Sequence, residues 1–387
     1  MNTIHTSRPP AGPAERIAGS SRRPATLGAA APGAISLAMG EPDAGTPAPI
    51  VNAAVRSLLG GRTRYSPMTG APALREALAT KISAEHARPT TAREVVLTHG
   101  GTAGLASAML ALVVPGDRVL IPEPTYSLYA DHAAMVGAEV VWVPARRDGS
   151  LDLTTLREEA SSARMIILCN PGNPTGRVYS TSDLSGIGEI LGMNPELLLL
   201  SDEAYGSIMF DGLEFASALD LPGVTSQVVF CGTLSKTYAM TGWRLGYVVA
   251  DGAHADKINL IHRTINGPLN TFVQDAALAA LETPSRDLRD AAVSYQERRD
   301  MVLKALSGIS GVEMLPPQGA FYAFPRIASD LSSDEMVARF ADAGVLVRSG
   351  TEFGPSGEGH VRISFATDVA SLDEGLRRFA QAVKDFS

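Results

Sequence analysis

One lysine of the chain stands apart by its position. Lys236 follows the apolar stretch 227–231, which has the composition of a buried strand, and it lies in the run Thr233-Leu234-Ser235-Lys236-Thr237. A charged amine at the end of a buried strand is costly unless it is engaged chemically, so this position predicts an amine nucleophile. The other lysines fall in helical patterns, in which a long stem keeps its charged head in water.

Polar side chains also follow other segments that have the composition of strands. In an open parallel sheet, the carboxyl ends of the strands meet at one edge, and ligands bind there. We therefore expect these side chains to form one site with Lys236. The segments are His99-Gly100-Gly101-Thr102-Ala103-Gly104, Pro122-Glu123-Pro124-Thr125-Tyr126, Asn170-Pro171-Gly172-Asn173-Pro174-Thr175-Gly176 and Ser201-Asp202-Glu203-Ala204-Tyr205.

The Gly100-Gly101-Thr102 turn precedes a helical pattern and is typical of an anion site. Backbone N–H groups at a helix N-terminus attract negative charge, although glycines also serve ordinary turns. The side chains that could complete a phosphate cup around this turn are Thr102, Thr233, Ser235 and Arg244.

Four other residues have both a chemical and a structural interpretation. Asp202 ends a run of leucines, so it either faces a cation such as a protonated ring nitrogen or caps a helix. Tyr205 could place its phenol in the same cavity, and Tyr126 could lay its ring on a planar ligand, whereas either alone is an ordinary core residue. Arg362 alternates with apolar neighbours on a predicted strand, where it either binds a carboxylate with both arms or makes a structural ion pair.

The composition favours small-molecule chemistry. The chain has 387 residues, 45% of them hydrophobic, and a net charge of −8. This length exceeds one ordinary core, and the charge argues against nucleic acid or an anionic membrane as a partner. No apolar run reaches about 20 residues and no secretory signal is visible, so we expect a cytoplasmic protein. We predict no metal site, and we interpret Cys169 and Cys231 as buried structural residues.

From about residue 48, helical and short apolar segments alternate. This alternation predicts an α/β protein with a mostly parallel seven-stranded sheet that helices cover on both faces. The predicted strands are 94–97, 118–121, 140–143, 165–169, 197–200, 228–231 and 246–249, and helical patterns lie at 104–113, 127–135, 153–160 and 182–191.

The remaining segments have a different pattern. A helical stretch at 255–307, broken near Gly267-Pro268, leads to strand patterns at 320–324, 345–347 and 361–365 and a closing helix from Ser371. We assign residues 51–284 to a large ligand-binding domain, and residues 34–50 with 285–387 to a small α+β domain. Residues 1–33 lack a helical or strand period and are rich in Pro, Ala, Gly, Ser and Arg, which predicts a flexible tail.

A nucleophilic lysine, a phosphate cup, a buried acid, a phenol, a stacking aromatic ring and a carboxylate-binding arginine together suit pyridoxal 5'-phosphate (PLP) and an amino acid. The chain resembles the class I/II aminotransferases of the fold-type I PLP-dependent enzyme superfamily, the group of aspartate aminotransferase. The motifs that carry the resemblance are Gly40-Glu41-Pro42-Asp43, Asn173-Pro174-Thr175-Gly176, Asp202-x-x-Tyr205, Ser235-Lys236, Arg244, Gln318-Gly319-Ala320-Phe321-Tyr322 and Val361-Arg362-Ile363-Ser364-Phe365.

The resemblance implies a role for each matched position in the large PLP-binding domain. Lys236 forms the Schiff base with PLP and then shuttles the proton, while Asp202 keeps the ring nitrogen protonated. Asn173 and Tyr205 hydrogen-bond the phenolic oxygen of the ring, and Tyr126 stacks on it. The phosphate ligands are Gly101, Thr102, Ala103, Thr233 and Arg244, with Tyr65 from a second subunit, and the α-carboxylate ligands are Gly40, Asn173 and Arg362.

The implied activity is transfer of an amino group from an α-amino acid to a 2-oxo acid by a homodimer with shared active sites. The bacterial aspartate enzymes of the family carry a basic residue on the helix after the phosphate turn, but residues 104–114 contain none here. Arg263 could contact the substrate from the neighbouring subunit. Ala44 stands where the family often has an aromatic residue, which implies a wider entrance.

Two other functions share part of this pattern. A PLP-dependent lyase or cyclase, which performs β- or γ-elimination or ring closure, uses the same cofactor residues, and product analysis distinguishes it from a transferase. A transcriptional regulator with this fold needs a folded basic DNA-binding domain, and a segment of about 33 residues without a pattern is too short for one.

Overall fold

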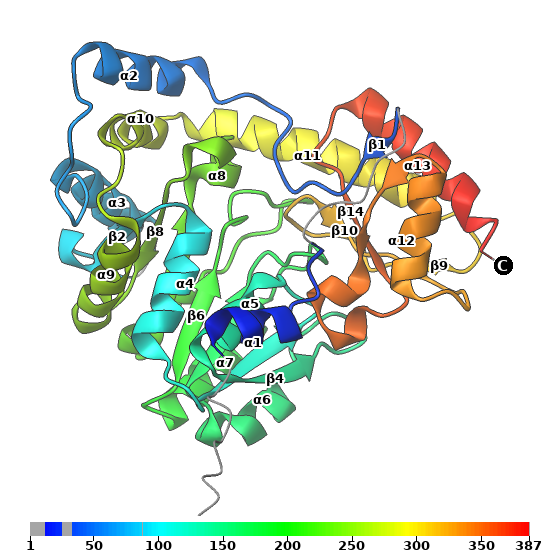
Figure 1. Cartoon of the computed structure of the whole chain (residues 1–387), viewed down its shortest axis with the longest axis horizontal. Helices are drawn as coiled ribbons and strands as arrows, with labels where there is room; N and C mark the ends of the chain where they lie inside the picture. Colours follow the sequence, from blue (N-terminus) through cyan, green and yellow to red (C-terminus); the bar gives the residue numbers. More distant parts are fainter. Residues whose placement is uncertain (1–11, 25–32, 87, 387) are drawn as a thin grey trace, which may run out of the picture.

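A seven-stranded sheet forms the centre of the computed structural model, which describes residues 12–24, 33–86 and 88–386. The strand order is β2-β8-β7-β6-β5-β3-β4, with β8 antiparallel to both neighbours and the other pairs parallel (Figure 1). This confirms the predicted α/β class, and each predicted strand overlaps one of the seven. They are β2 (Val95–Thr98), β3 (Arg118–Glu123), β4 (Glu139–Pro144), β5 (Met165–Cys169), β6 (Leu198–Asp202), β7 (Val228–Thr233) and β8 (Gly246–Val249).

Helices cover both faces of this sheet. Successive residues of a strand point to opposite faces, and the buried residues of the strands divide accordingly: Leu199 of β6 belongs to the same core cluster as residues of α7, whereas Leu200 belongs to the cluster that includes residues of α4. The α-helices between residues 48 and 281 are α2 (Ala48–Leu59), α3 (Pro72–Glu85), α4 (Gly101–Leu112), α5 (Leu128–Val136), α6 (Leu153–Glu159), α7 (Thr181–Met193), α8 (Leu234–Thr237), α9 (Gly252–Asn266) and α10 (Thr271–Leu281). Within the described ranges, no helix is both long and apolar enough to cross a membrane.

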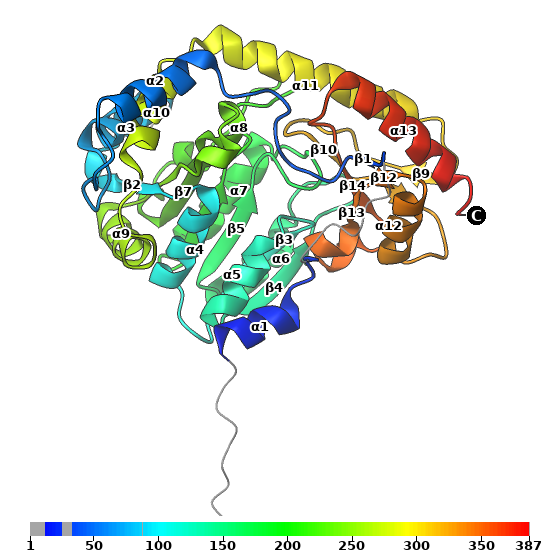
Figure 2. The same ribbon diagram turned by 45° about the horizontal axis from the view of Figure 1, so that its top comes forward.

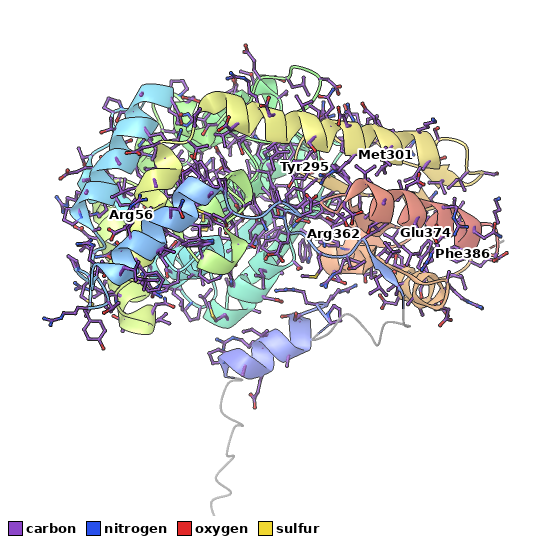
Figure 3. The ribbon with its side chains drawn as sticks, turned by 90° about the horizontal axis from the view of Figure 1, so that it is seen from above. Arg56, Tyr295, Met301, Arg362, Glu374 and Phe386 are labelled. Carbon is purple, nitrogen blue, oxygen red and sulfur yellow. The ribbon has the colours of Figure 1, made fainter. Side chains whose placement is uncertain are left out.

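The rest of the chain forms a second group of elements beside the sheet. Short strands β10, β14 and β13 make an antiparallel sheet, while β1 pairs with β12 and β9 with β11. The long helix α11 runs along the molecule with α13 beside it (Figure 3). The bounds are β1 (Ile35–Ser36), α11 (Ser285–Leu306), β9 (Val312–Glu313), β10 (Tyr322–Ala323), β11 (Arg326–Ile327), α12 (Ser333–Asp342), β12 (Val345–Leu346), β13 (Arg348–Ser349), β14 (Val361–Ser364) and α13 (Val369–Val383).

This second group has its own hydrophobic core. The rings of Phe340 on α12 and Phe379 on α13 stack with centroids 4.3 Å apart, and both side chains are fully buried. Separate cores are what two domains require, but the proposed domain boundaries stay a prediction.

The helical stretch predicted from 255 to 307 is broken twice rather than once, because Pro284 interrupts it a second time between α10 and α11.

The N-terminal segment contains a helix that the sequence pattern did not predict. Residues 13–20, expected to lack regular structure, form α1 (Pro13–Ser20), which packs against α5 (Figure 2). The Arg16 guanidinium donates to the carbonyl oxygens of Ala134 and Met135 near the end of α5, each at 2.7 Å. The expectation of a structureless segment was therefore wrong for these residues, since a tertiary contact stabilises the helix. The other parts of the predicted tail, 1–11 and 25–32, lie outside the described residues.

Candidate active site

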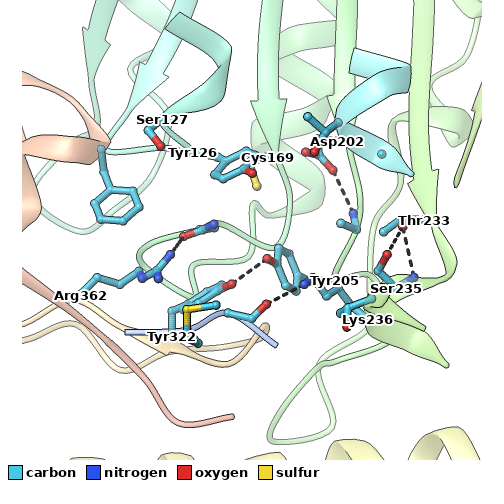
Figure 4. Close-up of a pocket in the computed structure, with 18 of the residues that line it drawn as sticks. Tyr126, Ser127, Cys169, Asp202, Tyr205, Thr233, Ser235, Lys236, Tyr322 and Arg362 are labelled. Carbon is cyan, nitrogen blue, oxygen red and sulfur yellow. Dashed lines mark hydrogen bonds between the residues drawn. The ribbon is translucent and has the colours of Figure 1, made fainter. Parts of the chain in front are cut away.

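A cavity of about 360 Å³ lies at the carboxyl ends of the central strands, and both parts of the chain line it (Figure 4). Twelve of the predicted site residues meet there although they are far apart in the sequence, as expected for the edge of a parallel sheet. These residues are Gly40, Gly101, Thr102, Tyr126, Asn173, Asp202, Tyr205, Thr233, Ser235, Lys236, Arg244 and Arg362.

Lys236 lies on the short helix α8, directly after β7. Its Nζ donates to the carbonyl oxygen of Gly40 at 2.6 Å and lies 5.9 Å from the centre of the Phe321 ring. Burial lowers the pKa of this amine to about 8, and the field of Glu41 opposes the decrease. An amine with this pKa is neutral, and therefore nucleophilic, far more often near neutral pH than an ordinary lysine.

Asp202 is the last residue of β6, where every side chain is buried. Its carboxylate accepts a hydrogen bond from the Tyr129 hydroxyl at 2.7 Å and another from the backbone N–H of Ala204 at 3.2 Å. Burial raises the pKa of Asp202 to about 6, while the hydrogen bond from Tyr129 opposes the increase. A buried carboxylate with two neutral donors is suited to receive a cationic group of a ligand.

One end of the cavity has the features of an anion site. Gly101 and Thr102 begin α4, and the Arg244 side chain approaches the turn before it so closely that a Cβ at Gly100 would lie 2.6 Å from the guanidinium. Glycine at position 100 is required for this approach, and its φ of +82° also favours glycine. Thr233 adds a hydroxyl that bonds Ser235 Oγ at 2.9 Å.

Arg362 lies at the opposite end of the cavity, on β14. Its guanidinium donates to Asn173 Oδ1 at 3.1 Å and to the carbonyl oxygen of Ala38 at 2.5 Å. The rings of Tyr322 and Phe353 hold it, with centroids 4.5 and 5.0 Å from its central carbon. Its Nε is buried without a hydrogen-bond partner among the described residues, so the guanidinium retains a donor for a ligand.

Two phenols lie between these ends. The Tyr205 and Tyr322 hydroxyls share a hydrogen bond of 2.9 Å. Tyr322 also approaches Gly40, where a Cβ would lie 2.0 Å from its hydroxyl oxygen. Any side chain at position 40 would therefore displace Tyr322 or the carbonyl that binds Lys236.

Three of the predicted residues do not line this cavity. Ala103 is on the first turn of α4 but is not among the lining residues, and Tyr65 is 93% exposed. Arg263 is exposed on α9. The contributions predicted for Tyr65 and Arg263 require a second subunit, so they stay predictions.

The structure also places residues in the site that the sequence reasoning missed. Tyr129 bonds Asp202 from α5, and Phe353 packs on Arg362. The ion pair between Arg348 and Glu352 forms part of the wall, and Arg23 reaches the cavity from the segment after α1. Only Arg348 carried a detectable signal, because it directly follows the predicted strand 345–347.

These features fit PLP and an amino acid. The buried Asp202 lacks a cationic donor among the described residues, Gly100 lets Arg244 approach the start of α4, and Arg362 has an unused donor. Together with a buried lysine of lowered pKa on an α/β scaffold, they define a fold-type I PLP-dependent enzyme.

The family follows from comparison with known proteins. Residues 32–379 match the family model of aminotransferase class I and II, and the chain belongs to this family. The aspartate aminotransferase of Pyrococcus horikoshii is 34% identical over 90% of both chains, and the arginine–pyruvate transaminase of Pseudomonas aeruginosa is 34% identical over 89% of this chain and 88% of the other. A structure of Thermus thermophilus aspartate aminotransferase with maleate has a TM-score of 0.88, with 30% identity over 95% of this chain and 98% of the other.

These comparisons confirm the resemblance derived from the sequence motifs. The protein is a PLP-dependent aminotransferase, a transferase that moves an amino group from an α-amino acid to a 2-oxo acid. A lyase or cyclase and a non-enzymatic regulator were the alternatives, and the relatives named above are aminotransferases instead.

Proposed function

We propose that Lys236 is the catalytic base of this transferase and that the cavity residues hold PLP and the amino acid in the roles predicted from the motifs. The observation that carries the proposal is the position of the Lys236 amine in one cavity with the buried acid Asp202 and the carboxylate-binding Arg362. The hydrogen bonds of Asp202, Lys236 and Arg362 support the assignment, because each of these side chains can still bind a ligand.

The residues would divide the reaction between them. When bound, PLP supplies an electron sink that stabilises negative charge at the substrate Cα. Asp202 holds a proton on the ring nitrogen, and Arg362 orients the α-carboxylate with Asn173. Lys236 would then remove the proton from Cα and deliver it to the carbon on the other side of the amino nitrogen, a transfer that its lowered pKa favours near neutral pH.

Replacement of the lysine tests this assignment. Lys236→Ala is expected to lose turnover and the absorbance near ~430 nm that lysine-linked PLP gives. The matched control is Lys257→Ala, since Lys257 is an exposed residue of α9, and this variant should retain both. A Lys236→Ala enzyme with wild-type turnover would contradict the role.

We further propose that the preferred amino donor has an acidic side chain. Residues 104–114 supply no cation, but Arg23 lines the cavity and forms no ion pair within the described residues. The names of several relatives, which are aspartate aminotransferases, support this choice. A cationic side chain is the second candidate, because Glu352 also lines the cavity and one relative is an arginine–pyruvate transaminase.

A panel of amino acids discriminates between these donors. The purified enzyme is incubated with each amino acid, and conversion of the cofactor to its aminated form is followed by absorbance. We expect aspartate or glutamate to react fastest, and Arg23→Gln to slow these two while leaving alanine unchanged. Fastest conversion with arginine, unaffected by Arg23→Gln, would favour Glu352 as the specificity residue.

We also infer a homodimer with shared sites. Helix α2 exposes the apolar side chains of Val51, Val55, Leu58 and Leu59, and Tyr65 follows it with 93% of its surface exposed. Exposed apolar rows of this kind mark interfaces.

A cytoplasmic location and the domain boundaries given above stay predictions.

Mixing two inactive variants tests the shared site. Lys236→Ala and Tyr65→Ala enzymes are each expected to be weak, but subunit exchange creates heterodimers with one intact site. Random mixing in equal amounts should therefore restore roughly a quarter of the wild-type activity. If the mixture stays at the mean of the two variants while light scattering shows dimers, Tyr65 does not act across the interface.

A further inference from the structure

A second cavity, of about 730 Å³, lies beside the active site and shares none of its lining residues. The large part of the chain contributes Arg146, Arg147 and Arg177 to its wall. The α11–α13 part contributes Arg326 and the apolar side chains of Leu315 and Phe324. These four arginines form a local group of positive charge in a chain whose net charge is −8.

Most of this positive charge has no acidic partner. Within the described residues, Arg146 forms an ion pair with Asp152 at 3.6 Å, whereas Arg147, Arg177 and Arg326 form none. The Nε of Arg177 is buried and has no hydrogen-bond partner there. A buried donor without an acceptor is costly, and a ligand that accepts from it would recover that free energy.

The two acids in the wall, Glu123 and Glu313, are fewer than the four arginines, and in the described part of the chain neither forms an ion pair with them. Glu123 is 2% exposed, and both of its oxygens accept hydrogen bonds from Ser356, from the backbone N–H at 2.9 Å and from the hydroxyl at 2.8 Å. Glu313 stands opposite Arg326 in the β9–β11 pair, but the two side chains form no ion pair. The cavity therefore keeps an excess of positive charge.

The second cavity borders the active site through shared segments. Four segments of the chain contribute to the walls of both cavities. On each segment, one residue lines the second cavity and another, two or three positions away, lines the active site. The pairs, with the residue of the second cavity first, are Glu123 and Tyr126, Thr175 and Asn173, Phe324 and Tyr322, and His360 and Arg362. The rings of Phe324 and Phe353 meet edge to face at 5.9 Å and separate the cavities. A ligand in one cavity thus contacts the segments that position Asn173 and Arg362 in the other.

We propose that this cavity is a second binding site, for a small organic anion with an apolar body. The guanidinium groups bind the anionic group, and the side chains of Leu315 and Phe324 contact the apolar body. Because the wall comes from both parts of the chain, the anion bridges them and changes the affinity of the active site for its carboxylate substrate. This second effect rests on the proposed function, whereas binding does not.

The site stays accessible in the homodimer inferred above. β4, next to Arg146 and Arg147, is one edge strand of the sheet, and β2 is the other. The exposed apolar helix α2 lies with α3 and α10, the helices that cover the β2 side (Figure 1). The dimer contact and the second cavity are therefore at opposite ends of the sheet.

Calorimetry with benzenesulfonate, an anion with an apolar ring, tests the binding. The holoenzyme should bind it saturably, and Arg147→Gln combined with Arg326→Gln should weaken binding about tenfold or more, because two charge-assisted contacts are lost. Arg362→Leu, which removes the carboxylate site of the active centre, should leave this binding in place. Arg93→Gln is the matched control, since Arg93 is an exposed arginine next to β2.

The outcomes separate the parts of the proposal. No saturable binding, or equal binding by the double variant and the wild type, would overturn the site. Saturating benzenesulfonate is expected to shift the KM for the amino acid in the wild type. If the same shift persists in the double variant, the coupling is overturned, because the shift then reflects competition inside the active centre. Both substituted arginines are exposed, so the double variant should melt at the wild-type temperature.

Discussion

The hydroxyl of Tyr129 favours the ionised form of the buried Asp202, and its removal gives a quantitative prediction. The two side chains are 1% and 7% exposed, and they share a hydrogen bond of 2.7 Å. A hydrogen bond to a charged group contributes about 1.5–3 kcal/mol, which corresponds to roughly ten- to a hundredfold in an acid dissociation constant. Tyr129→Phe deletes this bond and leaves the ring in place, so the pKa of Asp202 should rise further above its value of about 6.

The consequence concerns cofactor binding. With a pKa of about 6, Asp202 is mostly ionised at pH 7.5 and can hold a protonated ring nitrogen. In Tyr129→Phe, the carboxyl is protonated to a large extent at that pH, and the attraction is lost. We therefore expect the affinity of the cofactor-free enzyme for PLP to decline below about pH 6 in the wild type and already between pH 7 and 8 in the variant.

Fluorescence quenching of the cofactor-free enzyme by PLP, titrated from pH 5.5 to 8.5, measures this affinity. Tyr295→Phe is the control, because it removes a buried phenol that does not contact Asp202. If Tyr129→Phe and the wild type lose affinity at the same pH, the hydrogen bond does not set the charge of Asp202.

Three further substitutions have defined expectations. Burial raises the pKa of Glu203 from 4.5 to about 7, so its ionisation destabilises the fold as the pH rises through 7. The wild type should therefore lose up to about 3 kcal/mol of its free energy of unfolding between pH 4.5 and 8, and Glu203→Gln should abolish this loss, as measured by urea unfolding. Gly40→Ala places a Cβ 2.0 Å from the Tyr322 hydroxyl and should lower kcat/KM at least about tenfold, whereas Gly45→Ala, with no atom within 4 Å, should not. Arg16→Ala removes two bonds to α5 and should weaken the docking of α1 by about 1–3 kcal/mol, seen as faster hydrogen exchange of residues 13–20.

The central sheet and most of the site were predictable because their signals are local. Each central strand is a short apolar run bounded by turn residues, and the residues after such runs must lie at one edge of a parallel sheet. Lys236 and Asp202 were identified by this argument alone, and the structure places both in one cavity. Pro284, which breaks the long helical stretch a second time, also carried a local signal that our prediction overlooked.

Contacts between distant residues had no such signal. Helix α1 depends on a guanidinium that bonds carbonyls 118 and 119 residues away, so no pattern within residues 13–20 reveals it. Tyr129 and Asp202 are 73 residues apart, and a buried tyrosine on a helix looks like any core residue until its partner is known. The arginines of the second cavity likewise come from separate segments that carry no common motif.

The amino-acid sequence by itself determined the class of fold, the family and most of the residues that line the cavity, because periodicity and spacing act over short stretches of chain. Only the tertiary structure decided which neutral groups satisfy the buried charges and where unsatisfied ones remain. The reason is physical: the cost of burying a charge depends on the atoms within a few ångströms of it, and chain folding alone brings those atoms together.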